Sequence, residues 1–227
     1  MEREFDYRVP DELSEGLIVG SRVRVPLHGR RVAGWVVAQD VEPPAGVRLL
    51  PIAARRGFGP DPELVTLAEW AAWRWAGRQS AFLHAASPPR FVYRLPAPGD
   101  RRAPRTGPEP SQGTGGDGSR LDDEVVARAL TAGRAVVRLP PGSPRSGLVE
   151  ALVARTSGSV LVLCAARADA ERVSRLLSGR GTPVALLPEQ WAEASAGGRV
   201  VVGVRAAAWG PVPGLAAVLV LDGHEEA

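Results

Sequence analysis

Lysine is absent from this chain, because all 28 basic residues among its 227 residues are arginine. Any site that depends on a lysine ammonium group is therefore excluded. The single cysteine, Cys164, stands inside an apolar run and excludes both an internal disulfide and a cysteine-rich metal site. Since Ala, Gly, Pro and Val are also frequent, we attribute the lack of lysine to a GC-rich genome.

Long apolar runs are absent too. No stretch of about 18 uncharged apolar residues occurs, which excludes a spanning helix. The first four residues, Met1 to Glu4, include three charged side chains and no apolar segment, so we expect no secretory signal. The apolar fraction of 44% is typical of a protein with a buried core. Together with the lone cysteine, these features favour the cytoplasm and no membrane partner.

Negative charge is missing from one part of the chain. Residues 16–39 contain no carboxylate, whereas residues 121–227 contain 11 carboxylates and 11 arginines. A local excess of positive charge attracts polyanions such as DNA. The alternative is a solvated charged face without a ligand. The candidate DNA-binding arginines of this segment are Arg22, Arg24, Arg30 and Arg31.

Proline and glycine divide the chain. Eleven of the 25 residues at 96–120 are Pro or Gly, and apolar periodicity is lacking there. This composition is typical of a flexible linker. We therefore predict a first domain at residues 1–95 and a second at 121–227.

The first domain is predicted to be rich in short strands. Phe5–Val9 and Arg22–Pro26 alternate polar with apolar residues, and Ala33–Ala38 is apolar. His28-Gly29 predicts a turn that joins the last two segments into a hairpin.

A helix is predicted further along, with Asp61 as its N-cap, Pro62 at its first position and Gly77 at its end. It carries Trp70, Trp73 and Trp75. These rings could stack on bases, but tryptophans on a helix are usually packing residues, which is the interpretation we favour.

The second domain shows short apolar runs with helical patterns between several of them. Strands that are buried on both faces and joined by helices form a parallel sheet in a doubly wound α/β domain. The predicted strands are Ala135–Leu139, Val160–Cys164, Val184–Leu187, Val200–Val204 and Ala217–Leu221.

The loop after the first of these runs is where a phosphate-binding loop would lie. Such a loop needs glycines whose N–H groups converge on phosphate and a lysine that reaches the terminal phosphates. Here Leu139 and Pro144 replace the glycines and Arg145 replaces the lysine, so only Ser146 conforms. A proline-rich turn before a helix is the alternative interpretation.

The last apolar run ends in Asp222, where a nucleotide hydrolase would hold Mg²⁺. Gly223 stands where the next, water-activating carboxylate would be. The alternative is an exposed acidic tail. The candidate nucleotide site is therefore degenerate and consists of Gly142, Ser143, Arg145, Ser146 and Asp222.

Read in order, the motifs resemble the PriA family of replication-restart helicases. Phe5-Asp6-Tyr7, the strand Arg22-Val23-Arg24-Val25-Pro26 and Gly34-Trp35-Val36-Val37 are similar to that family's opening segments. Val200–Val212 resembles its stretch between motifs I and II, and Val160–Cys164 its strand before motif Ia.

The resemblance implies a small β-rich domain that recognises a DNA 3′ end at a stalled fork, followed by a RecA-like helicase lobe. By motif, the pocket residues would be Phe5, Asp6 and Gly29. The family's basic pocket residue falls near Leu50, with Arg48 as its substitute. The implied partners are forked or single-stranded-end DNA, primosome proteins and single-strand-binding proteins.

The chain also departs from the family. The family's additional strand before Phe5 has no counterpart, so we expect either a mis-assigned start or a truncation. The winged-helix domain and the zinc-binding cysteines have no counterpart either. The family uses ATP with Mg²⁺ and zinc, but we expect no cofactor and no catalytic residue here.

Two functions therefore compete: a DNA-binding replication-restart protein without ATPase activity, and an active ATP-dependent 3′–5′ helicase. Loss of the lysine, the loop glycines and the activating carboxylate favours the first.

Overall fold

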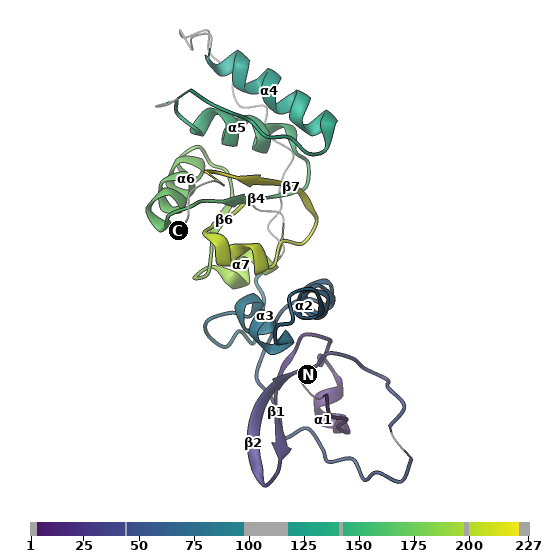
Figure 1. Cartoon of the computed structure of the whole chain (residues 1–227). Coiled ribbons are helices and arrows are strands. Elements are labelled where there is room, and N and C mark those ends of the chain that lie inside the picture. Colours follow the sequence, from purple (N-terminus) through teal and green to yellow (C-terminus); the bar gives the residue numbers. More distant parts are fainter. Residues whose placement is uncertain (1–3, 44, 98–117, 141–142, 198–199, 223–227) are drawn as a thin grey trace. The chain divides into compact units, whose positions relative to one another are not determined.

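The computed structural model describes residues 4–43, 45–97, 118–140, 143–197 and 200–222. The chain divides into two compact units, residues 1–95 with 209–211 and residues 96–208 with 212–227. Each unit has its own buried apolar clusters. The α/β fold class is confirmed, because one unit contains an antiparallel sheet and the other a parallel sheet with helices (Figure 1). Most of the predicted linker, residues 98–117, lies outside the described residues.

The first unit is built on a three-stranded antiparallel sheet with the order β2-β1-β3. The strands are β1 (Arg22–Leu27), β2 (Arg30–Trp35) and β3 (Ala54–Arg55). The predicted hairpin is confirmed, and its turn residues His28 and Gly29 both adopt positive φ, at 47° and 75°. Two residues with positive φ give the turn that matches the twist of paired strands.

The predicted strand Phe5–Val9 is wrong. Only an isolated parallel bridge forms there, between Arg8 and Pro51, and the short helix α1 (Asp11–Ser14) follows. Pro10 lacks the backbone N–H group that would donate the next bond of a parallel ladder, so the pairing does not continue past Arg8.

Two helices complete the first unit, α2 (Pro62–Arg74) and α3 (Gln79–Ala86). The predicted N-cap is confirmed, since the Asp61 Oδ1 accepts a hydrogen bond from the Leu64 N–H at 2.8 Å. The predicted end is wrong by one residue, because Ala76 and not Gly77 takes the left-handed conformation, with φ of 50°.

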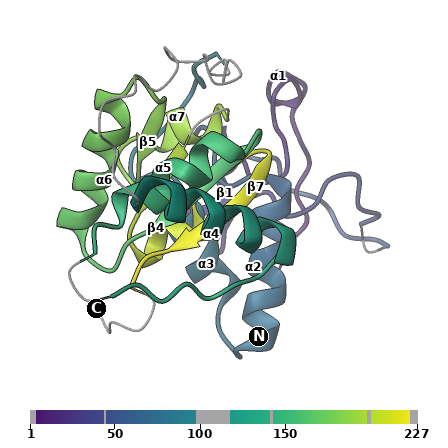
Figure 2. The same cartoon turned by 90° about the horizontal axis from the view of Figure 1, so that it is seen from above.

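The second unit holds a four-stranded parallel sheet with the order β5-β6-β4-β7. Its strands and helices are α4 (Gly118–Ala132), α5 (Ser146–Arg155), β4 (Ser159–Leu163), α6 (Arg167–Gly179), β5 (Val184–Leu186), α7 (Trp191–Ser195), β6 (Val200–Gly203), the 3₁₀ helix η1 (Arg205–Trp209) and β7 (Leu215–Val220). Helices α5 and α6 share one core with the sheet, and α4 packs on α5 (Figures 1 and 2). The valines of β4 and β6 are almost fully buried, which is typical of central parallel strands.

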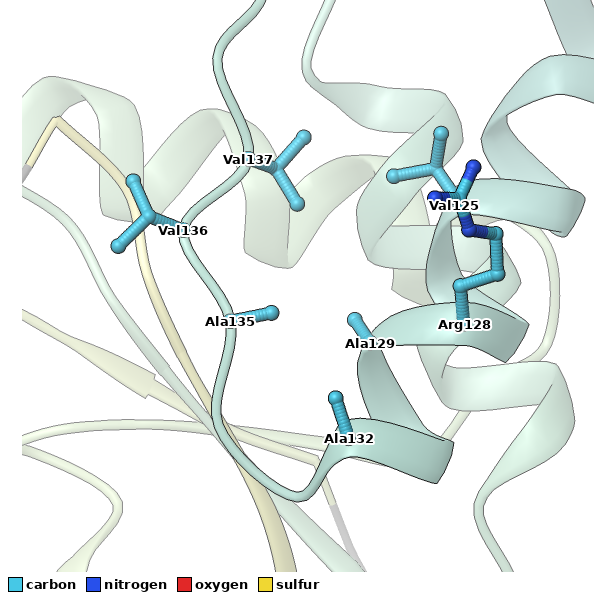
Figure 3. A pocket seen from close by; sticks show the side chains of 7 residues that line it. All are labelled: Val125, Arg128, Ala129, Ala132, Ala135, Val136 and Val137. Atoms are coloured by element: carbon cyan, nitrogen blue, oxygen red, sulfur yellow. The ribbon is translucent and has the colours of Figure 1, made fainter.

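The predicted strand Ala135–Leu139 is wrong. This segment pairs with none of the described strands, and Val136 is 88% exposed. Together with α4 it borders a hollow of about 440 Å³, with Ala135 and Val137 directed toward the helix (Figure 3). A short apolar segment becomes a strand only where a neighbour supplies hydrogen bonds. Pro140 and Pro141 directly follow this segment and cannot donate them.

The edge strand β7 pairs on one side with β4 and leaves Leu215, Val218 and Val220 exposed. The other predicted strands of this unit are confirmed, with bounds that differ by one or two residues.

Cys164 is buried directly after β4. Burial, and to a lesser extent the carboxylates of Asp169 and Asp222, raises the pKa of its thiol to about 11. An ordinary thiol, with a pKa of about 8.5, is roughly one quarter thiolate at pH 8, whereas this thiol would be roughly 0.1% thiolate.

We therefore expect Cys164 to react with a chromogenic disulfide reagent at pH 8 at least about 100-fold more slowly in the folded chain than in the urea-unfolded chain. The rate in the folded chain should rise about tenfold per pH unit between pH 8 and 10. Equal rates in the folded and unfolded chains would contradict the burial of this thiol.

Candidate nucleic-acid interface

The segment that carries Phe5 and Asp6 is held in place by three hydrogen bonds. The Tyr7 hydroxyl donates to the Pro26 carbonyl at 3.0 Å. The Arg8 N–H donates to the Leu50 carbonyl at 2.9 Å, and the Ile52 N–H donates to the Arg8 carbonyl at 3.0 Å. Burial raises the pKa of the Tyr7 phenol, which keeps it a donor at neutral pH. The segment therefore lies against residues 50–52 and against the end of β1.

Phe5 and Asp6 line a cavity of about 650 Å³ in the first unit. This volume is in the usual range of small-ligand pockets. Both side chains are exposed, so they stand where an entering ligand would meet them. The walls include apolar side chains of the inner sheet face, such as Val23 and Val25.

The cavity is acidic. Its described lining residues include three carboxylates, those of Glu4, Asp6 and Asp40, and no arginine. Negative potential repels phosphate and favours a group that donates hydrogen bonds. The polar side chains of Gln39, Gln79 and Ser80 also line it. The sequence analysis did not identify Gln39 and Asp40 as lining residues, because they follow the predicted strand Ala33–Ala38 and belong to no recognised motif.

The remaining predicted DNA-binding residues do not line this cavity. Gly29 lies in the hairpin turn, and Arg22, Arg24, Arg30 and Arg31 lie on β1 and β2. Residues opposite each other in an antiparallel ladder share a face. Arg24 pairs with Ala33 and Arg31 pairs with Pro26, so both lie on the face away from the buried Val23 and Val25.

Arg30 is different, because it pairs with Leu27 and lies on the inner-face side at the tip of the hairpin. Arg22 shares the outer face with Arg24 but is half-buried, and its Nη1 donates to the Pro88 carbonyl at 3.2 Å. Burial lowers the pKa of the Arg22 guanidinium, and the nearby Tyr93 phenol opposes the shift. The structure thus separates the predicted pocket residues from the outer-face arginines.

Arg48 does not line the cavity either, although its neighbour Leu49 does. Arg48 is exposed and lies three residues before Pro51, which pairs with Arg8.

The residues predicted to form a degenerate nucleotide site lie in the second unit, at the carboxyl edge of the sheet. Asp222 follows β7 and adopts a φ of 53°, and Arg145 precedes α5, which begins at Ser146. The Arg145 Nη2 lies 2.6 Å from the Asp222 Oδ1. The Asp222 side chain is 14% exposed and that of Arg145 is 50% exposed. Ser143 is exposed to an intermediate degree, and Gly142 lies outside the described residues.

These residues do not fit a magnesium–nucleotide complex. The guanidinium of Arg145 lies on the carboxylate oxygen that a metal ion would need. Pro144 offers no N–H to a phosphate, and the start of α5 has no side-chain cap. Among the described residues, no group of three His, Cys, Asp or Glu side chains could hold a metal ion.

In the part of the chain that the structure describes, no helix has both the length and the apolar character needed to cross a bilayer.

Comparison with known proteins supports the assignment of the first unit. Residues 1–88 match the family model described as the PriA 3′ DNA-binding domain. The chain is 30% identical over 244 residues to the probable replication restart protein PriA of Mycobacterium tuberculosis strain H37Rv and to that of Mycobacterium bovis. The alignment covers 97% of this chain and 36% of each relative, so the chain spans about a third of their length. Residues 1–88 therefore match the PriA 3′ DNA-binding domain, within a chain that is similar to PriA along nearly its whole length.

Proposed function

We propose that this chain is a DNA-binding protein of replication restart that recognises the 3′ end of a strand at a stalled fork. The observation that carries the proposal is the acidic cavity with Phe5 and Asp6, which lies in the residues that match the 3′ DNA-binding domain. A terminal 3′-hydroxyl donates a hydrogen bond that a carboxylate accepts, whereas an internal phosphate is repelled by it.

The second unit serves as a scaffold in this proposal and not as a motor. Its α/β sheet is compatible with a RecA-like helicase lobe, but the Arg145–Asp222 ion pair occupies the position that a metal ion and a nucleotide would need. We propose that the chain acts on forked or single-stranded-end DNA in the cytoplasm, with primosome and single-strand-binding proteins as partners.

The test compares two forks with the same sequence in a binding assay on the full chain. One fork has a free leading-strand 3′ end at the junction, and in the other that end is closed by a hairpin loop. Loss of one charge-assisted hydrogen bond costs roughly 1.5–3 kcal/mol, so we expect the closed fork to bind at least about tenfold more weakly. Equal affinities would reject end recognition.

A second expectation concerns the positive charge of the hairpin. Binding should weaken steeply with salt, because each neutralised phosphate releases counterions. Replacing Arg30 and Arg31 together by alanine should weaken binding equally on all sequences and lower the salt slope on duplex DNA by up to about 2. The matched control is Arg172→Ala, which removes an exposed arginine of α6 and should change neither quantity. An unchanged salt slope in the double variant would exclude these two arginines from the interface.

A further inference from the structure

The outer face of the three-stranded sheet carries a row of arginines. Strand pairing places Arg22, Arg24 and Arg31 on this face, and Arg56 beside Arg22, since the Arg56 N–H donates to the Arg22 carbonyl at 2.6 Å. We call these four residues the arginine face. Small residues flank its centre, because Arg24 has Ala33 and Ala54 as its cross-strand neighbours. The exposed guanidinium of Arg24 therefore stands clear of its neighbours.

The charge of the arginine face is not neutralised. None of its four guanidinium groups forms an ion pair with a carboxylate of the described residues, whereas several arginines of the second unit do. The Arg56 Nε is buried and has no hydrogen-bond partner among the described atoms. Unpaired cations that share one face create a positive potential that attracts a polyanion.

Two exposed aromatic rings lie at one end of the arginine face. The Phe91 ring is 4.7 Å from the Arg22 Cζ and 5.9 Å from the Arg56 Cζ. The Tyr93 ring lies 6.3 Å from the Phe91 ring, between centroids. Phe91 is 53% exposed and Tyr93 57% exposed, so the described residues leave about half of each side chain open to a ligand. Large aromatic side chains that remain exposed beside unpaired arginines are typical of surfaces that stack nucleic-acid bases.

The backbone of the segment that carries these rings makes contacts of its own with the first unit. The Phe58 N–H donates to the Val92 carbonyl at 2.7 Å, and Gly57 has no room for a Cβ because it would lie 2.3 Å from that carbonyl oxygen. The segment lies outside residues 1–88, which match the 3′ DNA-binding domain. Phe91 and Tyr93 are therefore free to contact a ligand without a demonstrated role in the fold of that domain.

We propose that the arginine face, together with Phe91 and Tyr93, binds a single strand of DNA through its phosphates and bases, without requiring a strand end. The arginines contact successive phosphates, and the two rings stack on bases at one end of the row. The cavity with Asp6 is lined by inner-face residues such as Val23 and Val25 and reaches Ala33 and Trp35 of the edge strand β2, whereas none of the four arginines lines it, so one fork could occupy both. This inference rests on the proposed DNA-binding function but not on the 3′-end pocket.

The test uses closed circular oligonucleotides, which have no 3′ end, with the full chain. One circle consists of thymidines, and the other contains the same number of abasic sugar-phosphate units. Stacking of one base on an aromatic ring strengthens binding about 5- to 150-fold. We expect the thymidine circle to bind at least about tenfold more tightly than the abasic circle.

The variants separate stacking from charge. Phe91→Ala and Tyr93→Ala should each reduce the preference for the thymidine circle and leave binding of the abasic circle unchanged, and Tyr93→Phe should retain the preference. Arg24→Ala should weaken binding of both circles and lower the salt slope by about 0.7. The control is Trp73→Ala, since Trp73 is a 77% exposed ring on α2 and lies outside the arginine face.

The proposal is overturned if the native chain binds neither circle or both circles equally, or if Phe91→Ala and Tyr93→Ala both keep the preference. Asp6→Ala should leave the affinity for both circles unchanged and weaken binding only of forks with a free 3′ end. A native chain that recognises a free 3′ end but binds neither circle would therefore reject this surface alone. A native chain that prefers the thymidine circle but does not recognise a free 3′ end would reject the pocket alone.

Discussion

The purified chain is expected to hydrolyse no ATP above background, with or without forked DNA. Phosphoryl transfer depends almost entirely on positioning and on stabilisation of charge. Removal of a single stabilising group typically lowers kcat about 10²–10³-fold, and here the lysine, the loop glycines and the second carboxylate are all replaced. The remaining carboxylate, Asp222, is held by Arg145 at 2.6 Å. The measurement is phosphate release at saturating Mg²⁺ and ATP.

A matched pair of variants distinguishes ATP hydrolysis by this chain from hydrolysis by a contaminating ATPase. Asp222→Ala removes the one carboxylate of the degenerate site, and Asp123→Ala removes a carboxylate that pairs with Arg155 on the surface. Turnover that survives in both variants comes from another protein. DNA-stimulated turnover that only Asp222→Ala abolishes would show instead that this site hydrolyses ATP.

The triple variant Pro144→Gly, Arg145→Lys and Gly223→Glu tests the cause. The variant removes the Arg145 guanidinium that contacts Asp222 and restores a backbone N–H in the loop. We therefore expect it to bind a fluorescent ATP analogue in a manner that depends on Mg²⁺. If the native chain already binds this analogue with equal affinity, the ion pair does not block the site.

The native chain is also expected to distinguish a 3′-hydroxyl from a 3′-phosphate at a fork. In the bound state the Asp6 carboxylate would be covered by DNA and would accept a hydrogen bond from the hydroxyl. A phosphate in that position leaves the carboxylate without a donor and beside a like charge, which costs roughly 1–3 kcal/mol, or about 5- to 150-fold in affinity. The carboxylates of Glu4 and Asp40 in the same cavity should add to the repulsion.

Asp6→Ala should reduce the difference between the two affinities, mainly by weakening the complex with the 3′-hydroxyl, while the repulsion from Glu4 and Asp40 remains. Asp11→Ala is the matched control, because Asp11 is an exposed carboxylate on α1 that does not line the cavity. Titration of fluorescent forks that differ only at the terminus measures both affinities. A native chain with equal affinity for both ends does not use Asp6 in this way.

Local sequence signals predicted much of the fold because they act over a few residues. The Asp61 cap and the His28-Gly29 turn depend on the backbone within one turn, and both were found. The buried strands of the parallel sheet were found because apolar runs of that length have few other stable positions. Ala135–Leu139 has the same pattern but lacks a paired neighbour, which local sequence cannot reveal.

The candidate sites depend on long-range geometry and were predicted only in part. Arg22, Arg24, Arg30 and Arg31 formed one set in the sequence, but register divides them between two faces of a sheet. The tryptophans of α2 were expected to pack, and this holds only in part. Trp70 and Trp75 pack edge-to-face with ring centroids 5.6 Å apart, whereas Trp73 is 77% exposed. The buried face of α2 is formed by Val65, Ala68 and Ala71. The contact between Arg145 and Asp222 joins residues 77 positions apart, and no local pattern indicates it.

The edge strand β7 has a consequence for handling the protein. Of the described strands, only β4 pairs with it, so its other side presents backbone N–H and C=O groups beside exposed Leu215, Val218 and Val220. Such an edge is a template onto which a strand from a second molecule can add, and natural proteins usually block it with charges, a proline or a bulge. Residues 215–220 contain none of these charges or prolines, and a single register shift at Ala216 is the one irregularity in their pairing with β4. Self-association through intermolecular β-pairing is therefore the characteristic route by which concentrated solutions of this chain would aggregate.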